Sequence, residues 1–455
     1  DQPRSRGLGD VYKRQPRYLV GCINEIGAKQ KADNVSGLLG EYSLKIFYES
    51  RSPKLPQGFL LRIGIDDFKN INESHGNEYG DYILRRTAQC IEENIGPEQS
   101  LFHIVADEFA VVDFSGGSVQ QAEDLFHEIK KSIYAFIEQN QYKAVYTVSG
   151  GIVKNGDVDN SFENAMKLSE FALSEAKERG KNSCYVFEEE EYEDYLKSRT
   201  LLRQLHHAVN NGFEGFEAYF QPLVNAANGE LTGAETLLRF HSPEGGMVSP
   251  GEFIPILEES GLIIPVGRWV LRQALDACRE WQKILPEFKV NVNLSYVQVL
   301  KSRVLTDVRR IVDEFGVKPS SVCIELTESG YLEENERFDK VWNGLKEYGV
   351  LLALDDFGTG YSNLRCLSDL KPAYIKIDRS FTLKALNREY EYRLLNHIVE
   401  MSHSLGLHVC VEGIETEGEL TKAKQTEPDY IQGFLFGKPC SRAEFTQKFF
   451  TKQAG

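Results

Sequence analysis

Twelve polar residues in the second half of this 455-residue chain have the types and spacing that metal-assisted chemistry needs. Most of them stand at the ends of short apolar runs, where a strand would pass into its loop. Carboxylates in such places are costly to bury unless they are paired or bound to metal. The repeated pattern therefore predicts a ring of carboxylates around divalent cations, and hard oxygen ligands suit Mg²⁺ or Mn²⁺. The twelve are Gln221, Glu235, Arg239, Asn293, Glu325, Glu328, Asp355, Asp356, Lys376, Glu412, Glu415 and Gln432.

Eight short apolar runs are the elements that must position these side chains. They alternate with stretches of helical pattern, and eight strands over about 250 residues fit a (β/α)₈ barrel. The active site of such a barrel lies at the C-terminal ends of its strands, which is where the acids fall. The predicted strands cover residues 216–223, 231–240, 290–294, 322–327, 351–355, 374–377, 409–412 and 430–432.

Composition is that of a globular protein of two or three domains. Hydrophobic residues make up 41% of the chain and aromatic residues 11%. The formal net charge of −16 leaves no basic stripe for phosphates, which argues against a nucleic-acid polymer as partner. The eight cysteines are scattered singly and predict reduced core residues of a cytoplasmic protein. No apolar stretch approaches the roughly 18 residues that span a bilayer.

The first 32 residues stand apart from the rest. Residues 10–15 read D-V-Y-K-R-Q, which resembles a translated sequencing adapter, so we expect residues 1–15 to be non-native and the natural protein to continue upstream. The apolar run within 16–32 resembles the last strand and exit linker of a PAS sensor domain. An ordinary strand and connector is the alternative.

Two folded regions follow. Strand and helix patterns alternate through residues 33–187, which predicts an α/β sandwich. An acidic run, E-E-E-E-Y-E-D, then marks a linker at 188–199, and the barrel occupies 200–448. The fold class is therefore α/β throughout, with a sandwich followed by a TIM-like barrel.

Several motifs of residues 200–448 are specific in themselves. They read Y-F-Q-P-L, A-E-T-L-L-R, V-N-L-S, E-L-T-E, D-D-F-G-T-G-Y-S-N-L, I-K-I-D, V-E-G-I-E and Q-G-F-L-F-G-K-P. Together they resemble the EAL domain, the cyclic di-GMP phosphodiesterase family, from end to end. The naming motif E-A-L reads E-T-L here, with Thr236 for alanine. Because Glu235 is retained, we expect this exchange to be tolerated.

The resemblance implies hydrolysis of cyclic di-GMP to linear pGpG with two cations per site, Mg²⁺ or Mn²⁺. It assigns one cation to Glu235, Asn293, Glu325 and Asp355, and the second to Asp355 and Asp356. It gives catalytic roles to Glu412 as general base or second-metal partner, to Lys376 on the attacking water, and to Asp356. It gives substrate contacts to Gln221, Leu237, Arg239 and Gln432, and supporting roles to Glu328 and Glu415. Asp378 of I-K-I-D is expected to cap the next helix.

Residues 33–187 resemble a GGDEF domain, the diguanylate cyclase fold, in D-N-V-S-G-L, I-G-I-D-D-F-K-N-I-N and S-G-G-I-V. The naming segment reads V-A-D-E-F, so Val105 and Ala106 replace both glycines and add Cβ atoms where a nucleotide would approach. Gly64 stands where the family has a metal-binding aspartate, and the R-x-x-D product-inhibition motif is absent. The resemblance therefore predicts a degenerate domain without cyclase activity.

Parts of the GGDEF nucleotide site are retained. Asn72 and Asp81 match guanine-contacting positions, and Asp107 and Glu108 remain. GTP binding without catalysis is one reading of this remnant, and a purely structural module that transmits a signal or mediates dimerisation is the other.

Three functions stay open for the whole chain. The first is a phosphodiesterase regulated by its first domain and assembled as a homodimer through the EAL domain. The second is a catalytically silent cyclic di-GMP receptor, against which the retained Glu235, Lys376 and Glu412 argue. The third is a bifunctional cyclase and hydrolase, against which Gly64 and the lost glycines argue.

Overall fold

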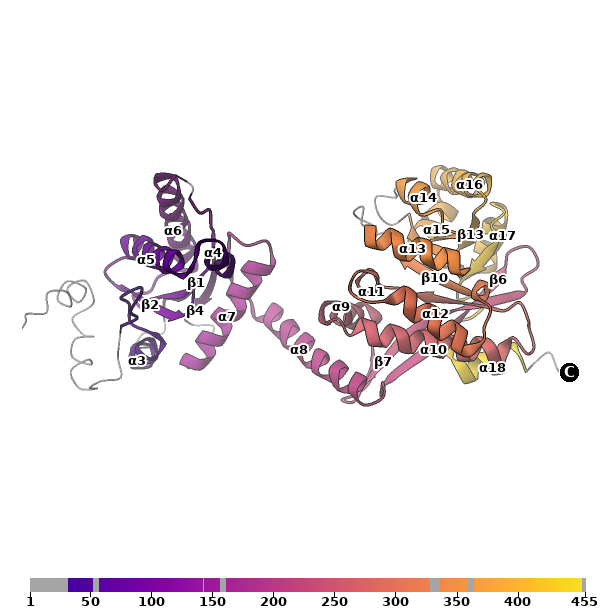
Figure 1. Cartoon of the computed structure of the whole chain (residues 1–455), viewed down its shortest axis with the longest axis horizontal. Coiled ribbons are helices and arrows are strands. Elements are labelled where there is room, and N and C mark those ends of the chain that lie inside the picture. The colour runs from indigo at the N-terminus through magenta and orange to yellow at the C-terminus, as the bar shows by residue number, and fades with distance from the viewer. Residues whose placement is uncertain are drawn as a thin grey trace, which may run out of the picture. The chain divides into compact units, whose positions relative to one another are not determined.

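The computed structural model describes residues 32–51, 57–141, 143–155, 161–327, 336–358 and 364–451. It divides into two compact units, residues 1–195 and 196–455 (Figure 1). The first unit has two hydrophobic cores and the second has one, counted over the described residues. The boundary falls inside one helix, α8 (Glu189–Asn210), whose first turn holds acidic residues of the predicted linker. The predictions for residues 1–15 and for nearly all of 16–32 lie outside the described ranges. None of the helices within those ranges is long and apolar enough to cross a bilayer.

The first unit is an α/β sandwich around a five-stranded sheet of order β2–β3–β1–β4–β5. Its strands are β1 (Phe59–Ile65), β2 (Gln99–Val105), β3 (Glu108–Asp113), β4 (Val148–Lys154) and β5 (Cys184–Val186). Its helices are α3 (Glu41–Arg51), α4 (Phe68–His75), α5 (Asn77–Asn94), α6 (Val119–Gln139) and α7 (Phe162–Glu178). Neighbouring strands are antiparallel except β4 and β5, which are parallel.

The central strand β1 is buried on both faces, and its alternating side chains divide between two cores. Leu61 and Ile63 pack with residues of α5 and α6, whereas Leu60 packs with residues of α3 and α7. Arg62 and Gly64 alternate with Ile63 and therefore lie on the α7 face. Helices α4 and α5 are separated at Gly76, whose φ of 85° suits glycine.

The second unit contains an eight-stranded barrel, which closes because β6 pairs with both β14 and β7. The barrel strands are β6 (Phe216–Asn225), β7 (Leu231–Ser242), β9 (Lys289–Asn293), β10 (Val322–Thr327), β11 (Leu351–Phe357), β12 (Tyr374–Ile377), β13 (His408–Val411) and β14 (Tyr430–Gln432). Two short strands, β8 (Gly246–Val248) and β15 (Cys440–Ser441), were not predicted. Strands β7 and β9 to β14 are parallel, but β6 runs antiparallel to both of its neighbours.

Helices cover the outside of the barrel and enclose its main core (Figure 1). They are α9 (Pro250–Ser260), α10 (Ile263–Trp281), α11 (Tyr296–Lys301), α12 (Val304–Phe315), α13 (Glu336–Tyr348), α14 (Leu364–Leu370), α15 (Arg379–Asn387), α16 (Glu389–Ser404), α17 (Glu417–Lys424) and α18 (Arg442–Phe449), with a 3₁₀ turn at Pro319–Ser321. The predicted barrel is thus confirmed, with one reversed strand.

Candidate active site

The pleat of the barrel strands sends side chains alternately to the helices and to the barrel axis. In β10, Val322 and Ile324 belong to the core beneath the helices, whereas Glu325 faces the axis. In β12, Ile375 and Ile377 likewise belong to that core, whereas Lys376 between them faces the axis. Because the strands are parallel and in register, the polar residues at their ends meet at one end of the barrel.

Lys376 lies at the centre of four carboxylates, three from different strands and Glu412 from the residue that follows β13. Its Nζ is 2.8 Å from Glu412 Oε1, 3.1 Å from the nearer oxygens of Glu235 and Glu325, and 3.3 Å from Asp355 Oδ1. The lysine side chain is 2% exposed and Glu325 is fully buried. The structure therefore brings five of the sequence-predicted residues into one cluster, with the ammonium as their common contact.

Burial and mutual repulsion shift the protonation of this cluster. Burial raises the pKa of Glu412 to about 8, although the neighbouring ammonium opposes this. Burial likewise raises the pKa of Asp355, and it raises that of Glu325 well above its ordinary value. Burial would lower the pKa of Lys376, but the surrounding carboxylates outweigh it and the pKa lies well above its ordinary value. Without further cations, Glu325, Asp355 and Glu412 therefore bind protons more readily than exposed carboxylates do.

Two side-chain amides contact Glu235, and a third contacts one of these two. Asn293 donates to one carboxylate oxygen over 2.8 Å, and Gln432 donates to the other over 2.7 Å. The Nε2 of Gln432 also lies 3.1 Å from Gln221 Oε1, and Gln221 in turn donates weakly to the carbonyl of Gly437. Burial acts to raise the pKa of Glu235, but the charge of Lys376 and these hydrogen bonds outweigh it and lower the pKa. Glu235 is therefore held as a carboxylate.

The adjacent acids Asp355 and Asp356 stand at a distortion of β11. The pairing of β11 with β12 shifts register between Leu354 and Phe357, as a bulge does. Asp356 has a φ of 57°, and its N–H donates to Asp355 Oδ1 over 2.9 Å. Burial, followed by the charge of Asp355, raises the pKa of Asp356 to about 6. The bulge lets two consecutive carboxylates act on one end of the barrel.

The donor set of this cluster fits a divalent cation. Glu235, Glu325 and Asp355 each offer an oxygen, and the three oxygens lie within 4.8 Å of one another. The buried Oε1 of Gln432 accepts no hydrogen bond from the described residues, so the site also contains a polar atom that lacks a partner. Carboxylate and amide oxygens are the ligands that Mg²⁺ and Mn²⁺ prefer.

Arg239 lies on the same strand as Glu235, four residues closer to the C-terminal end of β7. Leu237 and Arg239 follow at two-residue intervals, so they share its face of β7 toward the barrel end. The Arg239 guanidinium lies 5.5 Å from the ring centre of Tyr219 and donates to the carbonyl of Leu238. Burial lowers its pKa. Among the described residues it forms no ion pair, so its forked donors remain available to a phosphate.

The remaining predicted residues lie at the margin or beyond it. Asp378 caps α15 by accepting from the N–H groups of Ser380 and Phe381, as expected. The exposed Glu415 pairs with Arg379 and does not contact Lys376. Glu328 lies outside the described residues.

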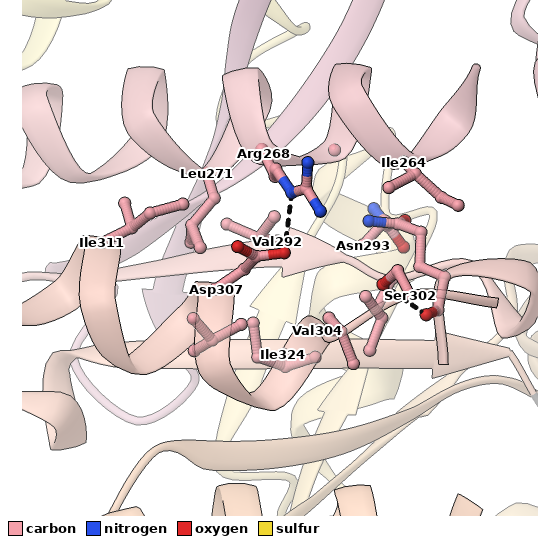
Figure 2. Close-up of a pocket in the computed structure, with 14 residues that line it drawn as sticks. Ile264, Arg268, Leu271, Val292, Asn293, Ser302, Val304, Asp307, Ile311 and Ile324 are labelled. Atoms are coloured by element: carbon pink, nitrogen blue, oxygen red, sulfur yellow. Dashed lines mark hydrogen bonds and ion pairs between the residues drawn. The ribbon is translucent and has the colours of Figure 1, made fainter. Parts of the chain in front are cut away.

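A cavity opens on the helix side of β9 and β10, behind the end of β9 (Figure 2). Apolar side chains such as Ile311 and Ile324 line most of it, and an ion pair of 2.7 Å joins Arg268 of α10 to Asp307 of α12. Asn293 is its only lining residue among the twelve predicted ones. This cavity therefore belongs to the packing between helices and strands, and the carboxylate cluster lies on the other face of β9.

Asn291 is a residue of the cluster that the sequence did not single out. Its Nδ2 donates to Glu325 Oε1 over 2.7 Å, and its side chain is only 7% exposed. Asn291 precedes Asn293 by two residues in V-N-V-N, so strand alternation alone could have placed both on the axis. Thr236 alternates with Glu235 and is buried with an Oγ1 that has no hydrogen-bond partner among the described residues.

Comparison with known proteins decides the family of the second unit. The family model of the EAL domain matches residues 202–439, which is more than half of the chain. The chain belongs to the EAL domain family. The model of the diguanylate cyclase GGDEF domain matches residues 43–183, so a GGDEF domain precedes the EAL domain.

Two curated relatives match most of this chain but are themselves longer. MucR of Pseudomonas aeruginosa, named a bifunctional diguanylate cyclase/cyclic di-GMP phosphodiesterase, is 29% identical over 84% of this chain and 55% of its own. The cyclic di-GMP phosphodiesterase PdeR of Escherichia coli is 29% identical over 85% of this chain and 58% of its own. This chain thus spans about half the length of these relatives.

A solved structure resembles the EAL domain. It is described as the PaMucR phosphodiesterase in a c-di-GMP complex, and it is 32% identical, with a TM-score of 0.51, over 54% of this chain and 99% of its own. The likeness is consistent with the barrel fold of the second unit.

The GGDEF domain has an unusual set of charges on its α7 face. Arg62 is 5% exposed, and its Nε donates to Glu108 Oε2 over 2.6 Å. A Cβ atom built on Gly64 would lie 2.9 Å from Lys177 Nζ, so the lysine head occupies the space where an aspartate side chain would begin. Burial raises the pKa of Asp107, although Lys177 opposes this. Arginine and lysine thus lie beside the two retained acids.

Asn72, which the sequence matched to a guanine-contacting position, packs against α5, and the altered naming segment forms a tight turn. The side chain of Asn72 covers Gly80, where any Cβ atom would lie 1.9 Å from Asn72 Oδ1, and Asp81 follows in α5. Ala106 has a φ of 50°, a left-handed conformation that favours the glycine found in the family motif.

Proposed function

We propose that the EAL domain of this chain is a cyclic di-GMP phosphodiesterase that forms linear pGpG with two Mg²⁺ or Mn²⁺ ions. The excess of carboxylates over cations carries the proposal. Lys376 faces four carboxylates, and Asp356 adds a fifth beside them. Five carboxylates and one ammonium have a formal charge of −4, which two divalent cations would balance. The names of MucR and PdeR, together with the cyclic di-GMP bound in the solved PaMucR complex, support this substrate.

Glu235, Asn293, Glu325 and Asp355 would hold the first cation, and Asp355 and Asp356 the second. Such cations, when bound, neutralise charge on a phosphodiester and favour a water nucleophile near neutral pH. Glu412 is the residue we assign to receive the proton of that water, because at 17% it has the most exposed side chain of the four carboxylates around Lys376. The ion pair between Lys376 Nζ and Glu412 Oε1, 2.8 Å long, would keep that carboxylate oriented.

Substrate contacts are assigned to the face of β7 and β6 that leads to the barrel end. Arg239 provides forked donors for a phosphate, since no described carboxylate engages it. Gln221 and Gln432 present amide groups beside Glu235, and Leu237 provides an apolar surface between Glu235 and Arg239.

The test is hydrolysis by the purified full chain. Cyclic di-GMP is incubated with the protein and Mg²⁺ or Mn²⁺, and the nucleotides are separated by chromatography. We expect pGpG from the wild type and none from Glu235→Gln or in the presence of EDTA. If the wild type binds cyclic di-GMP and leaves it intact with either metal, the chain is a receptor and the proposal is wrong.

We further propose that the GGDEF domain does not cyclise GTP and serves as a regulatory module. Gly64 offers no ligand at the position of the family's metal-binding aspartate. The Arg62 guanidinium supplies Glu108 with the positive charge that a metal ion would otherwise provide. GTP binding at the remnant of Asn72 and Asp81 stays part of this proposal.

The cyclase test uses the full chain carrying Glu235→Gln, so that any product is preserved. GTP and Mg²⁺ are supplied, and we expect no cyclic di-GMP. Formation of product would show that the domain is a cyclase. Calorimetry with GTP on the same variant then checks whether the remnant binds nucleotide.

A further inference from the structure

Glu325 is the most deeply placed acid of the cluster, and both of its oxygens are engaged. Its side chain has no solvent exposure. Oε2 lies 3.1 Å from Lys376 Nζ, and Oε1 accepts from Asn291 Nδ2 over 2.7 Å. A carboxylate on a flexible side chain can present either edge, so the partner of Oε1 decides which oxygen turns toward Glu235 and Asp355.

Asn291 lies two residues before Asn293 on β9 and therefore farther from the barrel end that carries the cluster. The parallel pairing sets Asn291 beside Cys323 and Asn293 beside Glu325. The Asn291 side chain also lines a small cavity on the barrel axis together with Cys323, Tyr374, Lys376 and Cys410. The amide therefore reaches Glu325 from beneath, on the side away from the barrel end.

We propose that Asn291 is a positioning residue for the cation site: its amide holds Glu325 Oε1 so that Oε2 joins the oxygens of Glu235 and Asp355. This inference rests on the metal-dependent function proposed above. Hydrogen bonds to metal-bound carboxylates from outside the ligand set are typically worth about 10–100-fold in metal affinity. Asn291 itself touches neither the substrate nor a cation in this assignment.

The decisive variant is Asn291→Leu, which keeps the size of the side chain and removes the donor. Mn²⁺ is titrated into the metal-stripped full chain without substrate, and free Mn²⁺ is measured by its electron paramagnetic resonance signal. We expect the dissociation constant for Mn²⁺ to rise about 10–100-fold. Cys323→Ala is the matched control, because it lines the same cavity without a hydrogen bond to a carboxylate among the described contacts, and its affinity should stay within about twofold of wild type.

Kinetics separate positioning from a general structural defect. The Mn²⁺ concentration for half-maximal activity should rise by the same factor as the dissociation constant, while kcat at saturating Mn²⁺ returns to within about threefold of wild type. Wild-type Mn²⁺ affinity in Asn291→Leu, or a loss of kcat that excess Mn²⁺ does not restore, would overturn the inference.

Two checks keep these results interpretable. Asn291→Ala is measured in parallel in case the leucine variant does not fold, as judged by circular dichroism, and the same rise in the dissociation constant is expected. If the wild type neither binds Mn²⁺ nor hydrolyses cyclic di-GMP, the proposed function fails and this inference fails with it. If the wild type does both and the two Asn291 variants bind Mn²⁺ as tightly as the wild type, only the role of Asn291 is refuted.

Discussion

Replacing Lys376 by methionine should destabilise the metal-free barrel strongly. At an effective dielectric constant of about 20, opposite charges about 3 Å apart attract by about 5.5 kcal/mol, and like charges no more than 4.8 Å apart repel by about 3.5 kcal/mol or more. The ammonium contacts four carboxylates and offsets their mutual repulsion. Without it, the carboxylates must take up protons, and breaking a buried ionic group of this kind costs about 3–5 kcal/mol.

Urea unfolding followed by tryptophan fluorescence measures this loss in the intact chain. All three tryptophans, Trp269, Trp281 and Trp342, lie in the second unit, so their emission reports on the barrel. In EDTA at pH 8 we expect Lys376→Met to lose about 3–5 kcal/mol of unfolding free energy. The loss should shrink at pH 6, because the pKa of Glu412 is about 8 and that carboxylate is then protonated.

The exposed Lys340 provides the control. Its ion pair with Glu336 is 3.9 Å long and lies at the surface, so Lys340→Met should change the unfolding free energy by less than about 1 kcal/mol. Equal stability of Lys376→Met and wild type in EDTA at pH 8 would refute the view that this ammonium neutralises the cluster.

Three further predictions concern the same domain. Glu412→Gln should lower turnover by about 10²–10⁴-fold in single-turnover assays while calorimetry finds little change in affinity for cyclic di-GMP, and a wild-type rate would remove Glu412 as the base. Thr236→Val should raise the unfolding free energy by about 1 kcal/mol, because it removes a buried hydroxyl that lacks a partner among the described residues. Thr426→Val is the control and should lower the unfolding free energy, because Thr426 Oγ1 donates to the carbonyl of Ala423. A Thr426→Val variant more stable than Thr236→Val would contradict this prediction. The metal-free barrel should lose stability as pH rises from about 4.5 to about 8, because the folded state keeps Glu412 protonated over that range and the unfolded state does not. Saturating Mn²⁺ should flatten the resulting decline in melting temperature with pH. Equal slopes of melting temperature against pH with and without Mn²⁺ would contradict this prediction.

Strand positions were predictable because the barrel strands are largely apolar runs, and β10 and β12 are buried along nearly all of their length. The strands Val322–Thr327, Tyr374–Ile377 and Tyr430–Gln432 begin and end where their patterns placed them. The direction of β6 was not predictable, since Y-F-Q-P-L reads as a buried strand in either orientation. Direction depends on the neighbours that the strand finds in the closed sheet, which lie far away in sequence.

The sequence predicted the five residues that the structure brings into one cluster, but it did not predict their contacts. The motif I-K-I-D predicted a role for Lys376, whereas its position among four carboxylates depends on the register of separate strands. Asn291 escaped notice because one polar residue inside an apolar run has many explanations. Arg62 escaped for a similar reason, as its partner Glu108 lies 46 residues away.

The reversed direction of β6 changes where the polypeptide arrives at the barrel. Phe216 pairs with Phe240, and the carbonyl of Gly215 accepts from the N–H of His241, so the incoming chain sits at the pole that carries Arg239. With a parallel first strand, the incoming chain and the carboxylates would occupy opposite poles of the barrel. Here the chain enters the barrel at the same end that carries the carboxylate cluster, so residues 211–215, which follow α8, lie beside that end.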